Sequence, residues 1–289
     1  MRSKLGPKIR QLISPQTRDE FENNHQLIKL WLKQPESDRP PILLVPGSFS
    51  GAWIWKGNFL EFFHQAGFEV AAMSFGGHGM RGPMLWKRGL KEFENDLIDT
   101  IMQFDKPPIL IAHSLGGLIA QRVALKVPIA GLALLAPIPL HGVLPSGLSL
   151  SKKSKGSLFK LAAIAFEPRL SRTASAPIGV YSANVDRATQ KQITGRLQAE
   201  SPTVLLQSLL PASSKYSKIP CPTKFWGAEG DEIIPSSEVL RAANTLGVEA
   251  TIFPGLSHTY QAEPEWPLVA KNIKEWLEEN VIASNHVST

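Results

Sequence analysis

Three polar side chains in this sequence have the types and the order along the chain that nucleophilic catalysis requires: Ser114, Asp231 and His258. A serine hydroxyl is a weak nucleophile at neutral pH, so it needs a base within hydrogen-bond reach, and the base needs a third group to orient it. The three residues lie far apart in the sequence. The surrounding elements must therefore bring three distant segments to one place.

Ser114 lies at a predicted strand-to-helix turn in ILIAHSLGGLIAQ, residues 109–121. The apolar run before it predicts a strand and the pattern after it predicts a helix, so the backbone must turn within about one residue. Such a turn leaves room only for small residues two positions away, here Ala112 and Gly116, while Gly117 lets the helix approach the sheet. The turn would expose the hydroxyl at a helix N-terminus, whose N–H groups can bind an anion. The alternative is a serine that caps the helix and has no chemical role.

His258 is the histidine that remains after the others are eliminated by position. Five histidines precede the region of the acid and one lies in the polar tail: His25, His64, His78, His113, His141 and His286. His258 lies in FPGLSHTYQAEPEW, a loop between a late strand and the final helix, which would place its imidazole over the strand ends. The alternative for a lone loop histidine is a solvated surface residue.

Asp231 is the predicted acid because it follows the predicted strand PTKFW, in WGAEGDEIIP. It lies 117 residues after Ser114 and 27 residues before His258. A short aspartate at a strand end can fix the imidazole tautomer and stabilise the imidazolium. Glu229 and Glu232 are rivals one or two residues away, and any of these acids could be merely solvated.

Two backbone N–H groups are predicted to stabilise a developing oxyanion. One belongs to Leu115, directly after the nucleophile, and the other to Ser48 in VPGSFSGAWIW, the early loop, where a glycine allows close backbone approach. Each such donor typically contributes about 3–4 kcal/mol in the transition state. Phe49, beside this loop, is the predicted substrate-binding residue. The alternative is an ordinary glycine turn into a helix, with Trp53 and Trp55 as core aromatics.

Strand-like runs alternate with helical patterns over most of the chain. The predicted strands are HQLIKLWLK, PPILLVPG, FEVAAMSF, PPILIAHS, IAGLALLAP, PTKFWGAEG and EATIFPG. Segments with a periodicity of 3.6 residues lie between most of them. This alternation predicts right-handed βαβ units, and hence an α/β fold with a mostly parallel central sheet and helices on both faces. Ligand sites in such sheets lie beyond the carboxyl ends of the strands, where the three side chains are predicted.

Residues 139–217 interrupt this alternation. The stretch is rich in Ser, Lys and Pro at first, LSLSKKSKGSLFK, and then helical, as in VDRATQKQITGRLQAES and TVLLQSLLP. It predicts a helical cap inserted into a core domain of residues 1–138 and 218–289. The apolar helices SLFKLAAIAF and TVLLQSLL are expected to face the active site and to favour an acyl or alkyl group. The alternative is that they pack against the sheet domain.

The composition excludes several classes of protein. With 289 residues, of which 43% are hydrophobic, the chain can bury a large core. The net charge of +6 comes from scattered basic residues without a nucleic-acid motif, so we expect no nucleic-acid partner. The single cysteine, Cys221, cannot form an internal disulfide and is typical of a reducing compartment.

No secretory signal or transmembrane segment is expected, because no apolar run in the sequence is long enough for either role. We therefore expect a cytoplasmic protein. No zinc-type Cys and His cluster and no phosphate-binding loop is found, so neither a metal nor an organic cofactor is expected. The oligomeric state is left open.

Four motifs together resemble the α/β-hydrolase superfamily, in its branch with a serine nucleophile: AHSLGG, PGSFSGAW, GDEIIP and LSHTY. They are spread from about Ile42 to Glu275, so the resemblance covers most of the chain. The early loop is similar to that of small esterases and hydroxynitrile lyases, and GGHGMRG is similar to a segment of lysophospholipase-like hydrolases. Two positions depart from these patterns. Pro46 replaces a histidine that often braces the oxyanion hole, and Gly77 stands where arginine is usual.

The resemblance implies a serine hydrolase that cleaves a carboxylic ester with a small to medium, apolar acyl or alkyl group. Ser114 would attack the ester carbonyl while His258 takes its proton, and water would then release the acid from an acyl-enzyme. Three alternatives stay open. The same triad could perform C–C bond hydrolysis, hydroxynitrile lysis or acyl transfer, or the chain could be a noncatalytic, receptor-like member of the fold. The third alternative is a lipase that makes weak contact with a membrane surface through its basic residues.

Overall fold

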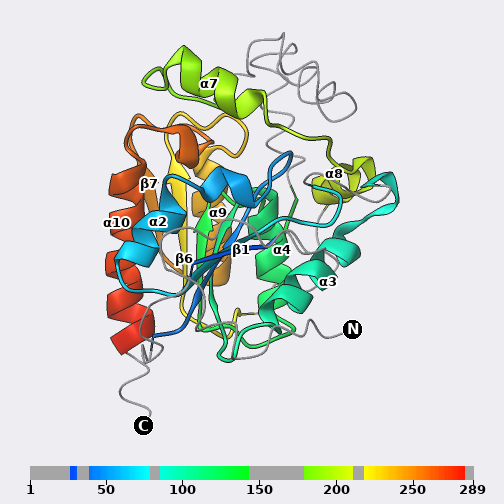
Figure 1. Cartoon of the computed structure of the whole chain (residues 1–289), viewed down its shortest axis with the longest axis vertical. Coiled ribbons are helices and arrows are strands. Elements are labelled where there is room, and N and C mark those ends of the chain that lie inside the picture. The colour runs from blue at the N-terminus through cyan, green and yellow to red at the C-terminus, as the bar shows by residue number, and fades with distance from the viewer. Residues whose placement is uncertain (1–26, 31–38, 79–84, 143–178, 211–217, 284–289) are drawn as a thin grey trace, which may run out of the picture.

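The computed structural model describes residues 27–30, 39–78, 85–142, 179–210 and 218–283, which include a seven-stranded sheet (Figure 1). The strands are β1 (Leu27–Leu30), β2 (Ile42–Val45), β3 (Val70–Met73), β4 (Ile109–His113), β5 (Gly131–Leu135), β6 (Thr223–Ala228) and β7 (Ala250–Phe253). Their order in the sheet is β1-β3-β2-β4-β5-β6-β7. β1 pairs antiparallel with β3, and every other neighbouring pair is parallel. The predicted α/β fold with a mostly parallel sheet is confirmed, and each predicted strand contributes to it.

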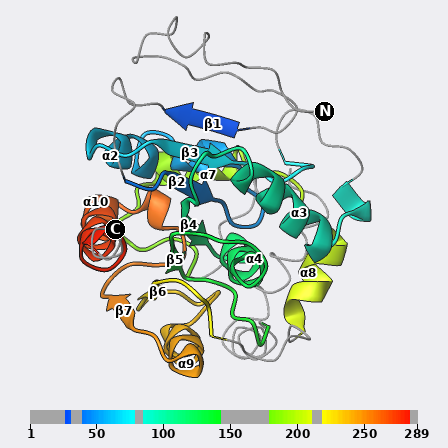
Figure 2. The same cartoon turned by 90° about the horizontal axis from the view of Figure 1, so that it is seen from below.

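Helices cover both faces of this sheet. The helical elements are η1 (Ala52–Trp55), α2 (Phe59–Gln65), η2 (Leu85–Lys87), α3 (Leu90–Ile101), α4 (Leu115–Ala124), α7 (Arg187–Thr194), α8 (Pro202–Leu209), α9 (Ser236–Leu246), η4 (Tyr260–Ala262), α10 (Trp266–Leu277) and η5 (Glu278–Ile282). In Figures 1 and 2, α2 and α10 lie together on one face, and α3, α4 and α9 lie on the other. Strands covered on both faces are apolar throughout rather than in alternate positions. β2, β3, β4 and β5 follow this rule, because every one of their residues is buried.

The strand register places the candidate site at the carboxyl ends of the central strands. Val45 at the end of β2 pairs with Ala112 of β4, so the early loop that follows β2 lies beside the turn that follows β4. Ala228 at the end of β6 pairs with Phe253 at the end of β7, so the loops that carry the predicted acid and histidine are also neighbours. All of these loops leave the same edge of the sheet.

The described part of the predicted cap consists of α7, α8 and the chain around them. α7 packs against η4, the turn that follows the predicted histidine, whereas α8 packs against α3 and η2. Val204 of α8 is fully buried and Leu206 is 64% exposed. TVLLQSLL therefore packs against the sheet domain, which is the alternative to the prediction that it faces the active site. SLFKLAAIAF lies outside the described residues, and the cap boundaries 139–217 stay a prediction.

Candidate active site

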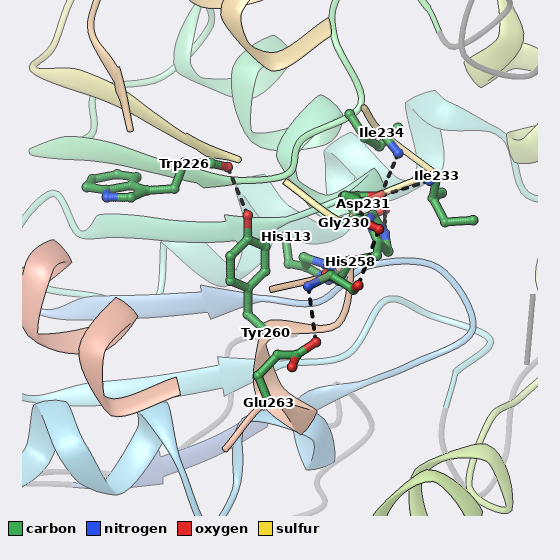
Figure 3. Close-up of polar contacts among 11 residues, drawn as sticks. His113, Trp226, Gly230, Asp231, Ile233, Ile234, His258, Tyr260 and Glu263 are labelled. Carbon is green, nitrogen blue, oxygen red and sulfur yellow. Dashed lines mark hydrogen bonds and ion pairs between the residues drawn. The ribbon is translucent and has the colours of Figure 1, made fainter. Parts of the chain in front are cut away.

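The structure brings Ser114, His258 and Asp231 into one hydrogen-bonded row. The Nε2 atom of His258 lies 3.0 Å from Oγ of Ser114. The Nδ1 atom of the same ring lies 2.7 Å from Oδ2 of Asp231 (Figure 3). All three side chains are buried. Segments that are distant in the sequence thus meet at the carboxyl ends of β4, β6 and β7.

Ser114 occupies a strained backbone conformation between β4 and α4. Its φ is 52° and its ψ is −118°, a region that non-glycine residues rarely adopt and that typically costs about 1–3 kcal/mol. Its N–H donates to the carbonyl of Leu135, and its carbonyl accepts from Gly117 and Ile138. The side chain forms no capping bond with α4. The alternative of a helix-capping serine therefore does not describe this residue.

Two glycines let α4 begin directly after this turn. A Cβ atom at Gly116 would lie 2.3 Å from the carbonyl oxygen of Pro46 and 2.9 Å from that of Val45. A Cβ atom at Gly117 would lie 2.5 Å from Cβ of Pro137. The sequence predicts that Gly116 is crowded by Ala112, but its nearest neighbours belong to the end of β2. Gly116 is small because the helix start meets the early loop there.

Of the three candidate acids, Asp231 is the one whose carboxylate contacts His258. Its other oxygen, Oδ1, accepts hydrogen bonds of 2.8 Å from the N–H groups of both Ile233 and Ile234. Glu229 is exposed, and its carboxylate accepts from the N–H of Gly255 in another direction. Two backbone donors on one oxygen fix the carboxylate so that the other oxygen faces the imidazole.

The loop that carries His258 is fixed on several sides. The His258 N–H donates to the carbonyl of Gly179, in the chain that leads to α7. The N–H of Ser257 donates to the buried carboxylate of Glu263, and its hydroxyl donates to the carbonyl of Gly230 (Figure 3). The hydroxyl of Tyr260 donates to the carbonyl of Trp226 within β6. The imidazole is thus held by its own loop, by the acid loop and by the chain next to α7.

His113 is part of this arrangement, although the sequence analysis sets it aside because it precedes the acid. Its Nε2 atom lies 2.9 Å from the carbonyl oxygen of His258. Burial, together with the neighbouring charge of His258, lowers the pKa of His113 to about 3. The ring is therefore neutral at neutral pH, and Nε2 donates its hydrogen to the carbonyl. A histidine inside an apolar strand, directly before the elbow serine, is the sequence signal that could have found it.

Comparison with known proteins identifies the family. A model of the Alpha/beta hydrolase family matches residues 42–266 of the chain. The chain belongs to this family. A comparison with curated proteins found no match.

Solved structures of similar fold include several kinds of enzyme. A thermophilic esterase from Thermogutta terrifontis is 17% identical with a TM-score of 0.65, over 88% of this chain and 98% of the esterase. A monoacylglycerol lipase from Paleococcus ferrophilus is 19% identical with a TM-score of 0.61, over 88% of this chain and 98% of the lipase. A bromoperoxidase from Bacillus anthracis is 14% identical with a TM-score of 0.64, over 83% of this chain and 92% of that chain. At such identities the likeness shows the fold.

In this α/β hydrolase the early loop passes directly over Ser114. A Cβ atom at Gly47 would lie 3.0 Å from Cβ of Ser114 and 2.8 Å from Nδ1 of His113, so only glycine fits. Neither the N–H of Ser48 nor that of Leu115 donates a hydrogen bond to any residue that the structure describes. The two predicted donors thus lie on the two chain segments next to the serine hydroxyl.

The residue after Ser48 adopts an unusual backbone conformation. Phe49 has a φ of 64°, and its side chain is half-buried. Its N–H donates to Oε2 of Glu200 at 3.1 Å, and its carbonyl accepts from the N–H of Gln198 at 2.9 Å. A substrate contact of Phe49 stays a prediction. The chain between α7 and α8 therefore holds the backbone of Phe49 through two hydrogen bonds, one to the carboxylate of Glu200 and one from the backbone of Gln198.

The two tryptophans of the early loop differ in their surroundings. Trp55 is fully buried, as the core alternative predicts. Trp53 is half-buried, and the guanidinium carbon of Arg196 lies 4.4 Å from the centre of its ring. Trp55 therefore packs in the core, and Trp53 packs against the chain that follows α7.

Gly76 and Gly77 form a turn after β3, as predicted for the segment GGHG, and His78, which follows them, is buried. Gly77 has a φ of 101°, and the N–H of His78 donates to the carbonyl of Phe75. The Nε2 atom of His78 lies 3.2 Å from Oε2 of Glu200, and both side chains are almost fully buried. Burial lowers the pKa of His78, but the charge of Glu200 and a hydrogen bond to it outweigh that effect, so the pKa is raised overall. No local pattern in the sequence indicates this pair.

Two further observations concern the residues that the structure describes. They contain no group of three His, Cys, Asp or Glu side chains that could hold a metal ion. None of their helices combines the length and the hydropathy needed to cross a membrane.

Proposed function

We propose that this α/β hydrolase is a serine hydrolase that cleaves carboxylic esters through an acyl-enzyme intermediate. The observation that carries the proposal is the 3.0 Å contact between Oγ of Ser114, at a positive φ, and Nε2 of a buried histidine. Nucleophile and base at hydrogen-bond distance, with the base oriented by a third group, are the signature of covalent acyl transfer.

The proposed reaction follows from the atoms in contact. Oγ of Ser114 attacks the ester carbonyl carbon while its proton moves to Nε2 of His258, and the carbonyl oxygen becomes an oxyanion. The N–H groups of Ser48 and Leu115 donate to that oxyanion. The C–O bond then breaks, and the leaving alcohol takes the proton from Nε2. Water repeats these steps on the acyl-enzyme, which releases the acid and restores the hydroxyl of Ser114.

Asp231 has the role of fixing the imidazole tautomer. Because Oδ1 is occupied by two backbone donors, Oδ2 accepts the Nδ1 hydrogen of His258 and leaves Nε2 free to accept a proton. The same contact stabilises the imidazolium that forms during the reaction.

The substrate class rests on less direct support. Solved structures of the same fold include esterases and a monoacylglycerol lipase, so we propose an ester with a small to medium, apolar acyl or alkyl group. The helical cap over residues 139–217, the substrate contact of Phe49 and the cytoplasmic location belong to the same proposal and stay predictions.

The test combines covalent labelling with a panel of substrates. The wild type is treated with a fluorophosphonate probe, the labelled residue is mapped by mass spectrometry, and turnover of p-nitrophenyl acetate, butyrate and octanoate is measured. We expect the label on Ser114, and we expect Ser114→Ala to lose both label and turnover while it stays folded. Ser237→Ala, at an exposed position of α9, is the matched control and keeps both.

Other outcomes separate the alternatives. A folded wild type that takes up no label and hydrolyses no ester would support a receptor-like member of the fold. Turnover of mandelonitrile or of a β-diketone in place of the esters would assign the same three residues to lyase or C–C bond chemistry. Sedimentation with anionic vesicles at low salt, lost at high salt, would support a surface-acting lipase.

A further inference from the structure

Glu200 is a buried carboxylate to which the proposed reaction assigns no step. It lies in the chain between α7 and α8 and is 1% exposed. Its Oε1 atom accepts from the N–H of Ser201 at 2.8 Å, and its Oε2 atom accepts from the N–H of Phe49 at 3.1 Å. Nε2 of His78 lies 3.2 Å from the same Oε2 atom. Buried carboxylates are costly unless they are paired and hydrogen-bonded, and Glu200 meets this requirement through two backbone N–H donors and an ion pair with His78.

The contact with Phe49 is one of three that fix successive peptide groups of the early loop. The hydroxyl of Ser50 donates to the carbonyl of Gly47 at 3.0 Å. Glu200 accepts from the N–H of Phe49, and the carbonyl of Phe49 accepts from the N–H of Gln198 at 2.9 Å. Each of the three peptide planes between residues 47 and 50 is therefore held by a hydrogen bond, one from a side chain of the loop itself and two from the chain between α7 and α8.

These contacts determine where the N–H of Ser48 points. The carbonyl of Gly47 and the N–H of Ser48 belong to one rigid peptide plane, and the next plane is the one that Glu200 holds. Phe49 keeps a φ of 64°, a conformation that non-glycine residues hold only when the surroundings impose it. Without an acceptor for its N–H, Phe49 is free to return to negative φ. The peptide plane that carries the N–H of Ser48 would turn as a consequence.

A carboxylate next to an oxyanion-binding loop creates an electrostatic conflict that His78 resolves. The negative charge of Glu200 would oppose a developing oxyanion unless a positive charge balanced it. The groups that face His78 are Glu200, the guanidinium of Arg88, whose charge opposes protonation, and the ring of Phe93 at a centroid distance of 5.8 Å. The charge of Glu200, whose Oε2 atom lies 3.2 Å from Nε2 of His78, raises the pKa of His78 against the effect of burial and so favours the protonated ring beside this carboxylate.

We propose that Glu200 and His78 form a positioning pair for the oxyanion-binding loop, which aims the N–H of Ser48 at the reacting carbonyl oxygen. Glu200 acts through the N–H of Phe49, and His78 acts by neutralising the carboxylate. Neither side chain needs to touch the substrate. The inference rests on the proposed function, because it assigns to Ser48 the role of an oxyanion donor.

The test measures kcat and KM for p-nitrophenyl butyrate in three variants. Removal of one oxyanion donor typically lowers kcat about 10²–10³-fold, so we expect Glu200→Ala to lower kcat by at least about tenfold with KM changed by less than about twofold. Glu200→Gln keeps an acceptor oxygen for Phe49 and should recover a part of that loss. His78→Gln removes the balancing charge and should lower kcat about fivefold or more, again with little change in KM.

Glu94→Gln is the matched control for the loss of a buried carboxylate. Glu94 is 1% exposed and pairs with Arg122 and Lys126, between α3 and α4 and away from the early loop. This variant should unfold at a lower urea concentration and keep the wild-type kcat. A defect in kcat that is confined to the Glu200 and His78 variants therefore reports on positioning and not on general stability.

The outcomes distinguish this inference from the proposed function. If the wild type hydrolyses esters and Glu200→Ala keeps kcat within about twofold, the inference is overturned and the proposed function stands. If the wild type neither hydrolyses esters nor takes up the fluorophosphonate, both are overturned. Should Glu200→Ala fail to fold, His78→Gln decides: a loss of kcat supports the pair, and an unchanged kcat overturns it.

Discussion

The Nε2 atom of His113 donates a 2.9 Å hydrogen bond to the carbonyl oxygen of His258. The residue directly before the proposed nucleophile thus holds the backbone of the residue that carries the proposed base. The two imidazole rings lie 4.8 Å apart, centroid to centroid. Because every residue of β4 is buried, this bond ties the loop of His258 to a strand inside the core.

Loss of this bond is expected to slow the reaction. His113→Ala removes the donor and opens space beside Ser114, so the loop of His258 can shift, and we expect kcat for p-nitrophenyl butyrate to fall about tenfold or more. His113→Gln carries an amide donor at a similar reach and should retain more activity. A kcat of His113→Ala equal to that of the wild type would show that the bond has no positioning role.

His113 is also expected to make stability depend on pH. Its pKa is lowered to about 3 from an ordinary value of 6.5, so between these values the unfolded chain binds a proton that the folded chain does not. Stability must then fall as pH decreases from about 6.5 towards 3, by up to about 1.4 kcal/mol per pH unit from this group alone. Urea unfolding at pH 7, 6, 5 and 4 measures the slope.

The slope should be smaller in His113→Gln than in the wild type, because the glutamine does not titrate. If His113→Gln follows the wild-type curve, burial of His113 does not govern the fall of stability at acid pH.

The fold could be predicted from the sequence because its signals are local. Apolar runs between helical patterns become the strands, and β4 and β6 form within the predicted segments PPILIAHS and PTKFWGAEG. Ser114 could be predicted because the strand, the small residues and the helix that define the turn are adjacent in the sequence. Asp231 and His258 followed from their positions after strands.

The contacts that hold the site could not be predicted in the same way. The pair of His78 and Glu200 joins residues 122 positions apart, and no local pattern indicates it. The apolar stripe of α8 indicates that one face is buried but not which partner buries it. The sequence predicts that this face covers the active site, whereas the helix packs against α3 and η2. Local periodicity specifies elements, whereas these choices depend on three-dimensional packing.

Asp231→Asn is expected to block proton transfer by changing the tautomer of His258. The Oδ1 atom of Asp231 accepts from Ile233 and Ile234, so an asparagine would keep its oxygen there and turn its NH₂ group towards Nδ1. Nδ1 would then accept, Nε2 would carry the hydrogen, and Ser114 would lose its base. The serine-protease precedent is a loss of roughly 10⁴ in kcat.

Glu229→Gln and Glu232→Gln are the controls for the assignment of the acid, and both should keep kcat near the wild-type value. Ester turnover and the rate of fluorophosphonate labelling measure the effect, with circular dichroism to check the fold. If Asp231→Asn keeps the wild-type kcat and Glu232→Gln is inactive, the acid is Glu232. That outcome would contradict the contact between Asp231 and His258.

Gly116→Ala is expected to lower both stability and turnover, because the new Cβ atom would clash with backbone atoms, which cannot move aside as a flexible side chain can. The atom would lie 2.3 Å from the carbonyl oxygen of Pro46, so either α4 or the early loop must move. Overpacking of this kind typically costs about 1–3 kcal/mol, and a shift of the early loop would also displace Gly47 and Ser48 from the reacting carbonyl. Thermal unfolding and kcat are measured, and a Gly116→Ala protein with wild-type kcat would mean that the early loop can yield without losing its function.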